Sequence, residues 1–234
     1  MELGKAFTYI FQDKRWFSKL LLGWLVSIVP ILNFAFTGYY TQTMRNVEVN
    51  REEPLPEWDD FGKKFVLGFY MWLAGIVFAL PLILLSFVYI IPIAVAGEGQ
   101  ASDTVNALMA GTGVLVTCVI ALYGLALSLF LPAMNINLAR KETLGSVFEI
   151  GEFFRIFRAN TGDYLVAWIM TIVWAIVIGT VGTLIGAFIF AVPIIGWCFG
   201  WIIVPVFLGM LNIVIFQVYA HLFGQVAAKQ ALTA

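Results

Sequence analysis

Charged residues are scarce in this sequence. Its 234 residues include 13 lysines and arginines and 14 aspartates and glutamates, together 12% of the chain, whereas a soluble domain carries about 25%. Apolar residues make up 62%. A soluble fold of this size could not cover so much apolar surface, so the composition predicts a membrane protein.

Other scarcities exclude whole classes of function. One histidine and two cysteines exclude a multi-ligand metal centre and a disulfide framework. A net charge of −1 lacks the basic footprint of a nucleic-acid-binding protein. The pattern contains no nucleophile beside a base, no phosphate-binding loop and no paired carboxylates. We therefore expect neither an enzyme nor a cofactor.

The charge-free stretches predict the membrane helices. They cover residues 20–44, 65–97, 104–139 and 164–228. Because the hydrocarbon core needs about 20 apolar residues per helix, the second and third stretches each predict one long or tilted helix. The fourth predicts two helices separated at Pro193–Gly196, and the first predicts a hairpin if the chain turns at Pro30–Asn33.

The basic residues favour the hairpin. If the chain turns at Pro30–Asn33, all 13 lysines and arginines fall on one side of the membrane, as the positive-inside rule requires of the cytoplasmic side. The outer turns near Pro30, from Gly97 to Asp103 and near Pro193 then carry only Glu98 and Asp103 as charges. The predicted fold class is an all-α polytopic membrane helix bundle with six spans in three helical hairpins and both termini cytoplasmic.

The first hairpin is short for a full crossing. Trp16 to Val29 would form about 21 Å of helix, against a core of about 30 Å. This hairpin is therefore either compressed or re-entrant, and five spans with a kinked first helix remain the alternative. We expect one membrane domain over 1–234, divided into an interfacial helix 1–15, the first hairpin 16–47, an acidic cytoplasmic loop 48–64, the second hairpin 65–139, a cytoplasmic amphipathic segment 140–163 and the third hairpin 164–228.

Segment 140–163 carries an apolar face at helical spacing. Val147, Ile150, Phe153, Phe154 and Phe157 form this face, and basic residues lie beside it. A helix of this type lies in the headgroup layer with its basic residues toward anionic lipid.

The most distinctive polar run is the acidic motif, formed by Leu55, Pro56, Glu57, Trp58, Asp59, Asp60 and Phe61. One interpretation is a helix start with Pro56 at the first helical position and acids in the first turn. The other is a docking or cation site that also includes Glu52 and Glu53. Its spacing matches no known cation loop, so the helix start is favoured, and a docking role is compatible with it.

A second set of candidate residues lies inside the last predicted span: Asn212, Gln217, His221 and Gln225. The last three are four residues apart and share one helix face. They predict either interhelical hydrogen bonds or the lining of a cavity that opens to the cytoplasm. No Asp, Glu, Lys or Arg lies inside any predicted span, which disfavours ion-coupled transport.

Several of these motifs together resemble a known family. They are Phe11–Trp16, Lys19–Gly23, the Pro-Ile turn at Pro30, Gly38-Tyr39, Arg45 and the acidic motif. This combination is similar to the prokaryotic integral-membrane family catalogued as domain of unknown function number four thousand and thirteen. The resemblance implies a multi-pass protein in the cell membrane of a bacterium or archaeon, and it supplies no catalytic residues.

The sequence thus predicts a non-enzymatic membrane protein acting as a scaffold, assembly factor or accessory subunit. Its expected partners are membrane lipids and another membrane or cytoplasmic protein that binds the acidic loop. Self-association through glycine-containing helix faces is a further expectation, and no nucleic acid is expected. The alternative function is a facilitative channel, a transporter or a lipid-handling protein.

Overall fold

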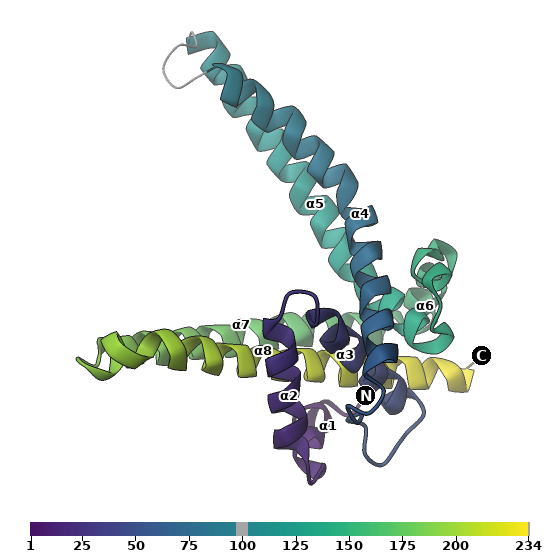
Figure 1. Cartoon of the computed structure of the whole chain (residues 1–234). Helices are drawn as coiled ribbons and strands as arrows, with labels where there is room; N and C mark the ends of the chain where they lie inside the picture. The colour runs from purple at the N-terminus through teal and green to yellow at the C-terminus, as the bar shows by residue number, and fades with distance from the viewer. Residues whose placement is uncertain (97–102, 234) are drawn as a thin grey trace. The chain divides into compact units, whose positions relative to one another are not determined.

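The computed structural model describes residues 1–96 and 103–233, and this part of the chain is helical without any strand (Figure 1). In chain order the elements are α1 (Leu3–Thr8), η1 (Tyr9–Gln12), α2 (Trp16–Ile28), α3 (Asn33–Glu48), α4 (Phe61–Ala96), α5 (Asp103–Lys141), η2 (Leu144–Phe148), α6 (Ile150–Ala159), α7 (Thr161–Ala191) and α8 (Ile195–Thr233). The predicted all-α class is confirmed.

Four helices among the described residues are long and apolar enough to cross a membrane: Phe61–Phe87, Gly111–Lys141, Thr161–Ala191 and Gly196–Ala231. They correspond to the predicted second and third hairpins. The break at Pro193–Gly196 is confirmed, because α7 ends at Ala191 and α8 begins at Ile195. The predicted outer turn from Gly97 to Asp103 includes residues 97–102, which lie outside the described residues.

The chain divides into two compact units. The first contains residues 1–71 and 133–234, and the second contains residues 72–132. Within the second unit α4 and α5 contact each other, and the Tyr123 hydroxyl donates a hydrogen bond to the Phe78 carbonyl at 2.8 Å. Most large apolar side chains described in this unit are exposed, which suits a pair of helices surrounded by lipid.

The first hairpin exists but is short. α2 ends at Ile28 and α3 begins at Asn33, so the predicted turn is confirmed. The hairpin packs on α8, where the Trp24 ring covers Gly209. Near the hairpin tip, Ser27 and Asn33 line one pocket with Leu208 of α8, and α8 extends thirteen residues, about 20 Å, from Leu208 to its start at Ile195. Six full spans are therefore not confirmed.

Glycines allow α7 and α8 to approach each other. A Cβ atom at Gly182 would lie 2.9 Å from a Leu208 methyl carbon, and one at Gly186 would lie 2.9 Å from a Val204 methyl carbon. The absence of a side chain at these two positions lets α8 side chains occupy the surface of α7, as is common between membrane helices.

The N-terminal segment and segment 140–163 bury more of their apolar side chains against the protein than helices that lie on a membrane surface would. Tyr9 and Ile10 of η1 are buried, and α1 contacts α8. In segment 140–163, Val147 and Phe153 are buried, whereas Ile150 and Phe154 face outward. Only part of the predicted apolar face is thus left for the headgroup layer, because α6 packs on α7 and α8.

A close helix crossing joins α3 to α4 through two reciprocal glycines. A Cβ atom at Gly38 would overlap the Lys64 carbonyl, and a Cβ atom at Gly68 would overlap the Phe34 carbonyl. The two helices cross in antiparallel directions. Phe34, which meets Gly68, lies four residues before Gly38, and Lys64, which meets Gly38, lies four residues before Gly68. Only glycine permits the two backbones to come this close.

We expect Gly38→Ala to destabilise the protein by about 2 kcal/mol or more, because overpacking against rigid backbone costs about 1–3 kcal/mol. Thermal or denaturant unfolding in detergent measures the change. Gly62→Ala is the matched control in α4, since its Cβ would meet nothing within 4 Å. Equal stability of the two variants would contradict the crossing.

Candidate functional site

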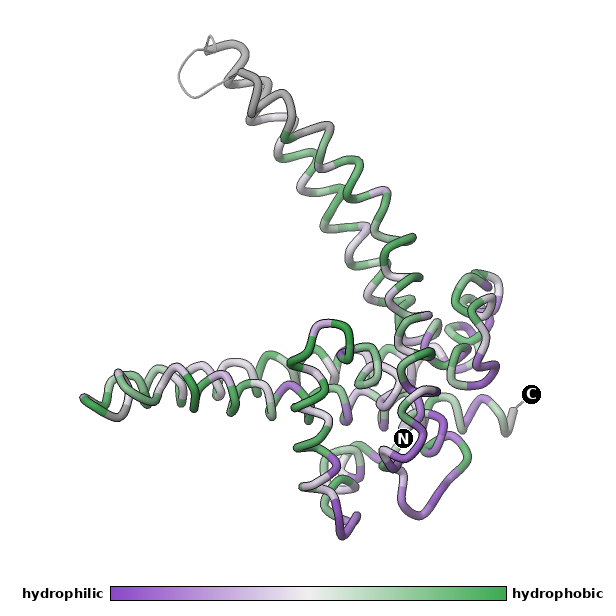
Figure 2. The backbone as a smooth tube through the Cα atoms, viewed as in Figure 1, coloured by the Kyte–Doolittle hydropathy of each residue, from purple (hydrophilic) through white to green (hydrophobic). Residues whose placement is uncertain are grey.

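Hydrophilic residues of the first unit gather in a region that we call the polar layer (Figure 2). It is formed by residues 1–19, 44–64, 137–163 and 217–230. The ion pair between Lys229 Nζ and Asp163 Oδ2, at 2.6 Å, joins the end of α8 to the beginning of α7 within this layer. The acidic motif and most of the predicted polar face lie here.

A buried ion pair lies at the centre of the polar layer. Lys19 and Asp13 are only 4% and 3% exposed, and Lys19 Nζ is 2.5 Å from Asp13 Oδ2. Lys19 Nζ also lies 2.8 Å from Glu57 Oε1 and donates to the Leu55 carbonyl at 3.1 Å. The three partners saturate the three N–H donors of the ammonium group.

These partners keep Lys19 charged. Burial alone lowers the pKa of Lys19, but the hydrogen bonds to Asp13 and Glu57 outweigh burial and raise its pKa above the ordinary value. The second oxygen of Asp13 accepts a hydrogen bond from the Arg15 backbone N–H at 2.7 Å. Both members of the pair are therefore satisfied, which a buried ion pair requires.

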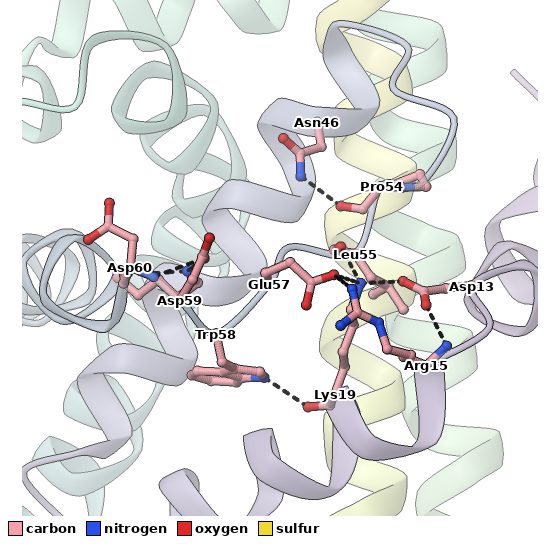
Figure 3. Close-up of polar contacts among 11 residues, drawn as sticks. Asp13, Arg15, Lys19, Asn46, Pro54, Leu55, Glu57, Trp58, Asp59 and Asp60 are labelled. Atoms are coloured by element: carbon pink, nitrogen blue, oxygen red, sulfur yellow. Dashed lines mark hydrogen bonds and ion pairs between the residues drawn. The ribbon is translucent and has the colours of Figure 1, made fainter.

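The acidic motif is anchored to the same lysine (Figure 3). Trp58 Nε1 donates a hydrogen bond to the Lys19 carbonyl at 3.0 Å. The Trp58 ring stacks on Tyr39, with centroids 4.5 Å apart and planes inclined by 11°. Leu55 and Pro56 are buried. Much of the motif thus faces the protein interior, and Trp58 is not free to bind a partner.

Asp59 and Asp60 differ from the rest of the motif because they are exposed. Asp60 Oδ1 accepts from the Lys63 backbone N–H at 3.3 Å, and Asp59 Oδ1 accepts from the Asp60 N–H at 2.9 Å. The helix start predicted at Pro56 is wrong, since α4 begins at Phe61 with Asp60 as its cap. An acidic residue nevertheless caps the observed start of α4, because Asp60 accepts the Lys63 N–H.

A second buried carboxylate joins three helices. Glu48, at the end of α3, accepts from Arg140 Nε and from Arg45 Nη1, both at 2.7 Å. The Arg140 guanidinium also donates to Gln230 Oε1 at 3.0 Å and to the Ala227 carbonyl at 3.1 Å. This cluster fixes the ends of α3, α5 and α8 relative to one another.

The predicted polar face on α8 makes intramolecular contacts. Gln217 and His221 are buried. Gln217 Oε1 accepts from the Thr43 hydroxyl at 3.1 Å, and its backbone carbonyl accepts from the Tyr9 hydroxyl at 3.0 Å. The Tyr9 ring lies 4.3 Å from the His221 ring, measured between centroids. Tyr9 of η1 and Thr43 of α3 therefore hold Gln217 in place.

His221 and Gln225 also border a cavity of about 570 Å³ that includes Lys5, Arg51 and Tyr9. Gln225 Nε2 lies 3.0 Å from His221 Nδ1 and donates to the Glu2 carbonyl at 3.1 Å. Gln217 thus contacts neighbouring elements through hydrogen bonds, and His221 and Gln225 lie beside the cavity. That this face lines a pathway from the cytoplasm stays a prediction.

Asn212 is separate from the other three predicted residues. It is exposed and lines a space of about 500 Å³ between α2, α3 and α8, which we call the hairpin cleft. Other polar residues of the hairpin cleft are Ser27, Asn33, Thr37 and Tyr40.

Over residues 1–96 and 103–233, no group of three or more His, Cys, Asp or Glu side chains could hold a metal ion. The expectation that the protein has no cofactor stays a prediction.

Sequence reasoning missed the buried Asp13–Lys19 pair, because a lysine at the start of an apolar helix is also typical of an anchor at the membrane surface. The available signal was an aspartate six residues before a lysine at the start of an apolar helix. That spacing indicates a buried ion pair only when Glu57 is considered with it, and Glu57 lies 38 residues beyond Lys19 in the sequence.

The fold and the polar layer together define a polytopic, all-helical membrane protein. The model of the family described as "Protein of unknown function (DUF4013)" matches residues 21–187. This match covers more than half of the chain and includes the acidic motif, so the chain belongs to this family, as the sequence resemblance predicted. Neither the curated proteins nor the solved structures yielded a match.

We expect Lys19→Met to destabilise the protein by about 3–5 kcal/mol, because it leaves the Asp13 carboxylate buried without its cation. Unfolding in detergent, followed by tryptophan fluorescence, measures the loss. Adding Asp13→Asn to this variant should recover part of it.

Arg15→Met is the control for this experiment, because it removes the exposed partner of Glu57, which lies 2.5 Å away. An exposed pair contributes about 1 kcal/mol or less. If Lys19→Met costs no more than Arg15→Met, the buried pair is not the anchor of the polar layer.

Proposed function

We propose that this protein is a non-enzymatic scaffold, assembly factor or accessory subunit of a membrane complex in the cell membrane of a bacterium or archaeon. The observation that carries the proposal is the way in which the acidic motif is held. Trp58 and Glu57 are fixed by internal contacts, while Asp59 and Asp60 keep exposed carboxylates at the start of a long helix. A fixed pair of carboxylates suits a basic segment of a partner protein.

The alternative of a facilitative channel has less support. A channel along the predicted polar face would have to pass Gln217, and the Tyr9 hydroxyl occupies that position. Lipid handling has support of its own in the hairpin cleft.

The topology that we propose has four full spans and a re-entrant first hairpin. From Ile195 to Gln217, α8 measures about 33 Å, close to the thickness of about 30 Å of one hydrocarbon core. The hairpin tip reaches Leu208, less than halfway along this length, and its apolar residues Leu25, Ile28 and Ile31 are exposed. Both termini and all basic residues then lie on the cytoplasmic side.

Cysteine accessibility tests this topology. In a background with Cys118→Ala and Cys198→Ala, single cysteines replace Gly4, Ile31 or Glu52 and are treated with a membrane-impermeant maleimide. We expect labelling of positions 4 and 52 only from the cytoplasmic face, and no labelling of position 31 from either face, since it lies in hydrocarbon. Labelling of position 31 from outside would show a full crossing instead.

The docking role is tested by Asp59→Asn with Asp60→Asn. Asparagine keeps the hydrogen bonds to the Asp60 and Lys63 N–H groups and is a good helix cap. Asp59→Asn also removes the charge that lies 3.8 Å from the buried Lys64 Nζ, so a melting curve checks that the variant is folded. We expect about tenfold lower recovery of a co-purifying partner from native membranes, measured by quantitative mass spectrometry.

Glu52→Gln with Glu53→Gln is the matched control, because it removes the same charge from exposed positions of the same loop. This control should keep the partner. An unchanged set of partners in the Asp59/Asp60 variant would refute the docking role.

A further inference from the structure

The hairpin cleft contains polar side chains that the protein itself does not satisfy. The Asn33 and Asn212 side chains make no hydrogen bond within residues 1–96 and 103–233, and both are exposed. Asn212 belongs to a candidate membrane span. An amide exposed to hydrocarbon without a partner costs free energy, so these two amides indicate a partner that arrives from the lipid phase.

The depth of the cleft narrows the choice of partner. Asn212 lies five residues before Gln217, where the polar layer begins, which corresponds to about 7.5 Å along α8. It lies sixteen residues, or about 24 Å, from Gly196 at the other end of the span. The cleft therefore lies on the hydrocarbon side of the polar layer, below the level of phosphate headgroups.

The lining of the cleft is neutral and amphipathic. No Asp, Glu, Lys, Arg or His lines it, and Phe36, Phe216 and Leu208 form apolar walls. A charged headgroup would find no counter-charge there, which is unfavourable in a membrane interior. An amide both donates and accepts hydrogen bonds, and this matches a group that carries a hydroxyl and ester carbonyls.

The α3 helix start does not provide an alternative anion site. Its first N–H groups are already used, since Asn33 N–H donates to Val29 at 2.9 Å and Ala35 N–H donates to Leu32 at 2.8 Å. Among the lining residues, the side-chain amides of Asn33 and Asn212 are the exposed polar groups for which the described residues supply no hydrogen-bond partner.

We propose that the hairpin cleft binds an uncharged glycerolipid with a free hydroxyl, of the diacylglycerol type. The hydroxyl and an ester carbonyl bond to Asn33 and Asn212, and the acyl chain lies against Phe36, Phe216 and Leu208. The uncharged lining favours a lipid without a phosphate over a phospholipid. The proposal goes beyond a scaffold role and does not require the exposed carboxylates of the acidic motif.

The test uses the full chain in nanodiscs of phosphatidylcholine with a photoreactive diacylglycerol as probe. We expect crosslinks at peptides containing residues 27–40 and 208–216, and competition by unlabelled diacylglycerol but not by added phosphatidic acid. Asn33→Leu with Asn212→Leu should lower crosslinking about tenfold, the effect of losing two neutral hydrogen bonds. Asn212→Gln, which keeps an amide, should retain part of the signal.

Thr183→Val is the matched control, because it removes an exposed polar group from α7 outside the cleft, and its crosslinking should equal that of the unmodified chain. Equal crosslinking in the double asparagine variant and in this control would overturn the proposal, as would equal competition by phosphatidic acid. If the unmodified chain is a dimer and the double variant is a monomer, the two amides bind a second copy of the chain and not a lipid. Gel filtration and a melting curve confirm that both variants are folded.

Discussion

The first unit depends on one buried cation. The Lys19 ammonium group holds Asp13, which precedes α2, and Glu57 and the Leu55 carbonyl, which follow α3. The carbonyl of the same residue holds Trp58. One residue thus connects the N-terminal segment, the first hairpin and the loop that leads into α4. A buried charge with partners from several segments fixes their relative positions, because displacing any of them leaves an ion without compensation in a medium of low dielectric constant.

The helices and their turns could be predicted from the sequence because lipid imposes a one-dimensional rule: a span is a run without charges. The turns at Pro30 and Pro193 followed from that rule and from local backbone preferences. The Asp13–Lys19–Glu57 cluster could not be predicted in the same way. Its burial depends on a loop 38 residues further along the chain, and no local pattern distinguishes a buried lysine from one at a membrane surface.

The acidic motif shows how tertiary contacts override a local signal. Proline followed by acidic residues is typical of a helix start, yet α4 begins five residues after Pro56. The Leu55 carbonyl accepts from Lys19, and the Trp58 ring lies between Tyr39 and Gly23. These contacts keep the chain non-helical until Asp60. The distinctive composition of the motif at Leu55–Trp58 therefore reflects architecture, and Asp59 and Asp60 are its most exposed residues.

The depth of the first hairpin has a consequence for the surrounding bilayer. α7 and α8 extend about 20 Å beyond the hairpin tip, so the cross-section of the first unit is larger at the polar layer than at the opposite end. With the hairpin in one leaflet, that leaflet gives up more area to the protein than the other. In the proposed topology the first unit, taken by itself, therefore displaces more lipid from the leaflet that contains the hairpin, so its insertion favours expansion of that leaflet over the other.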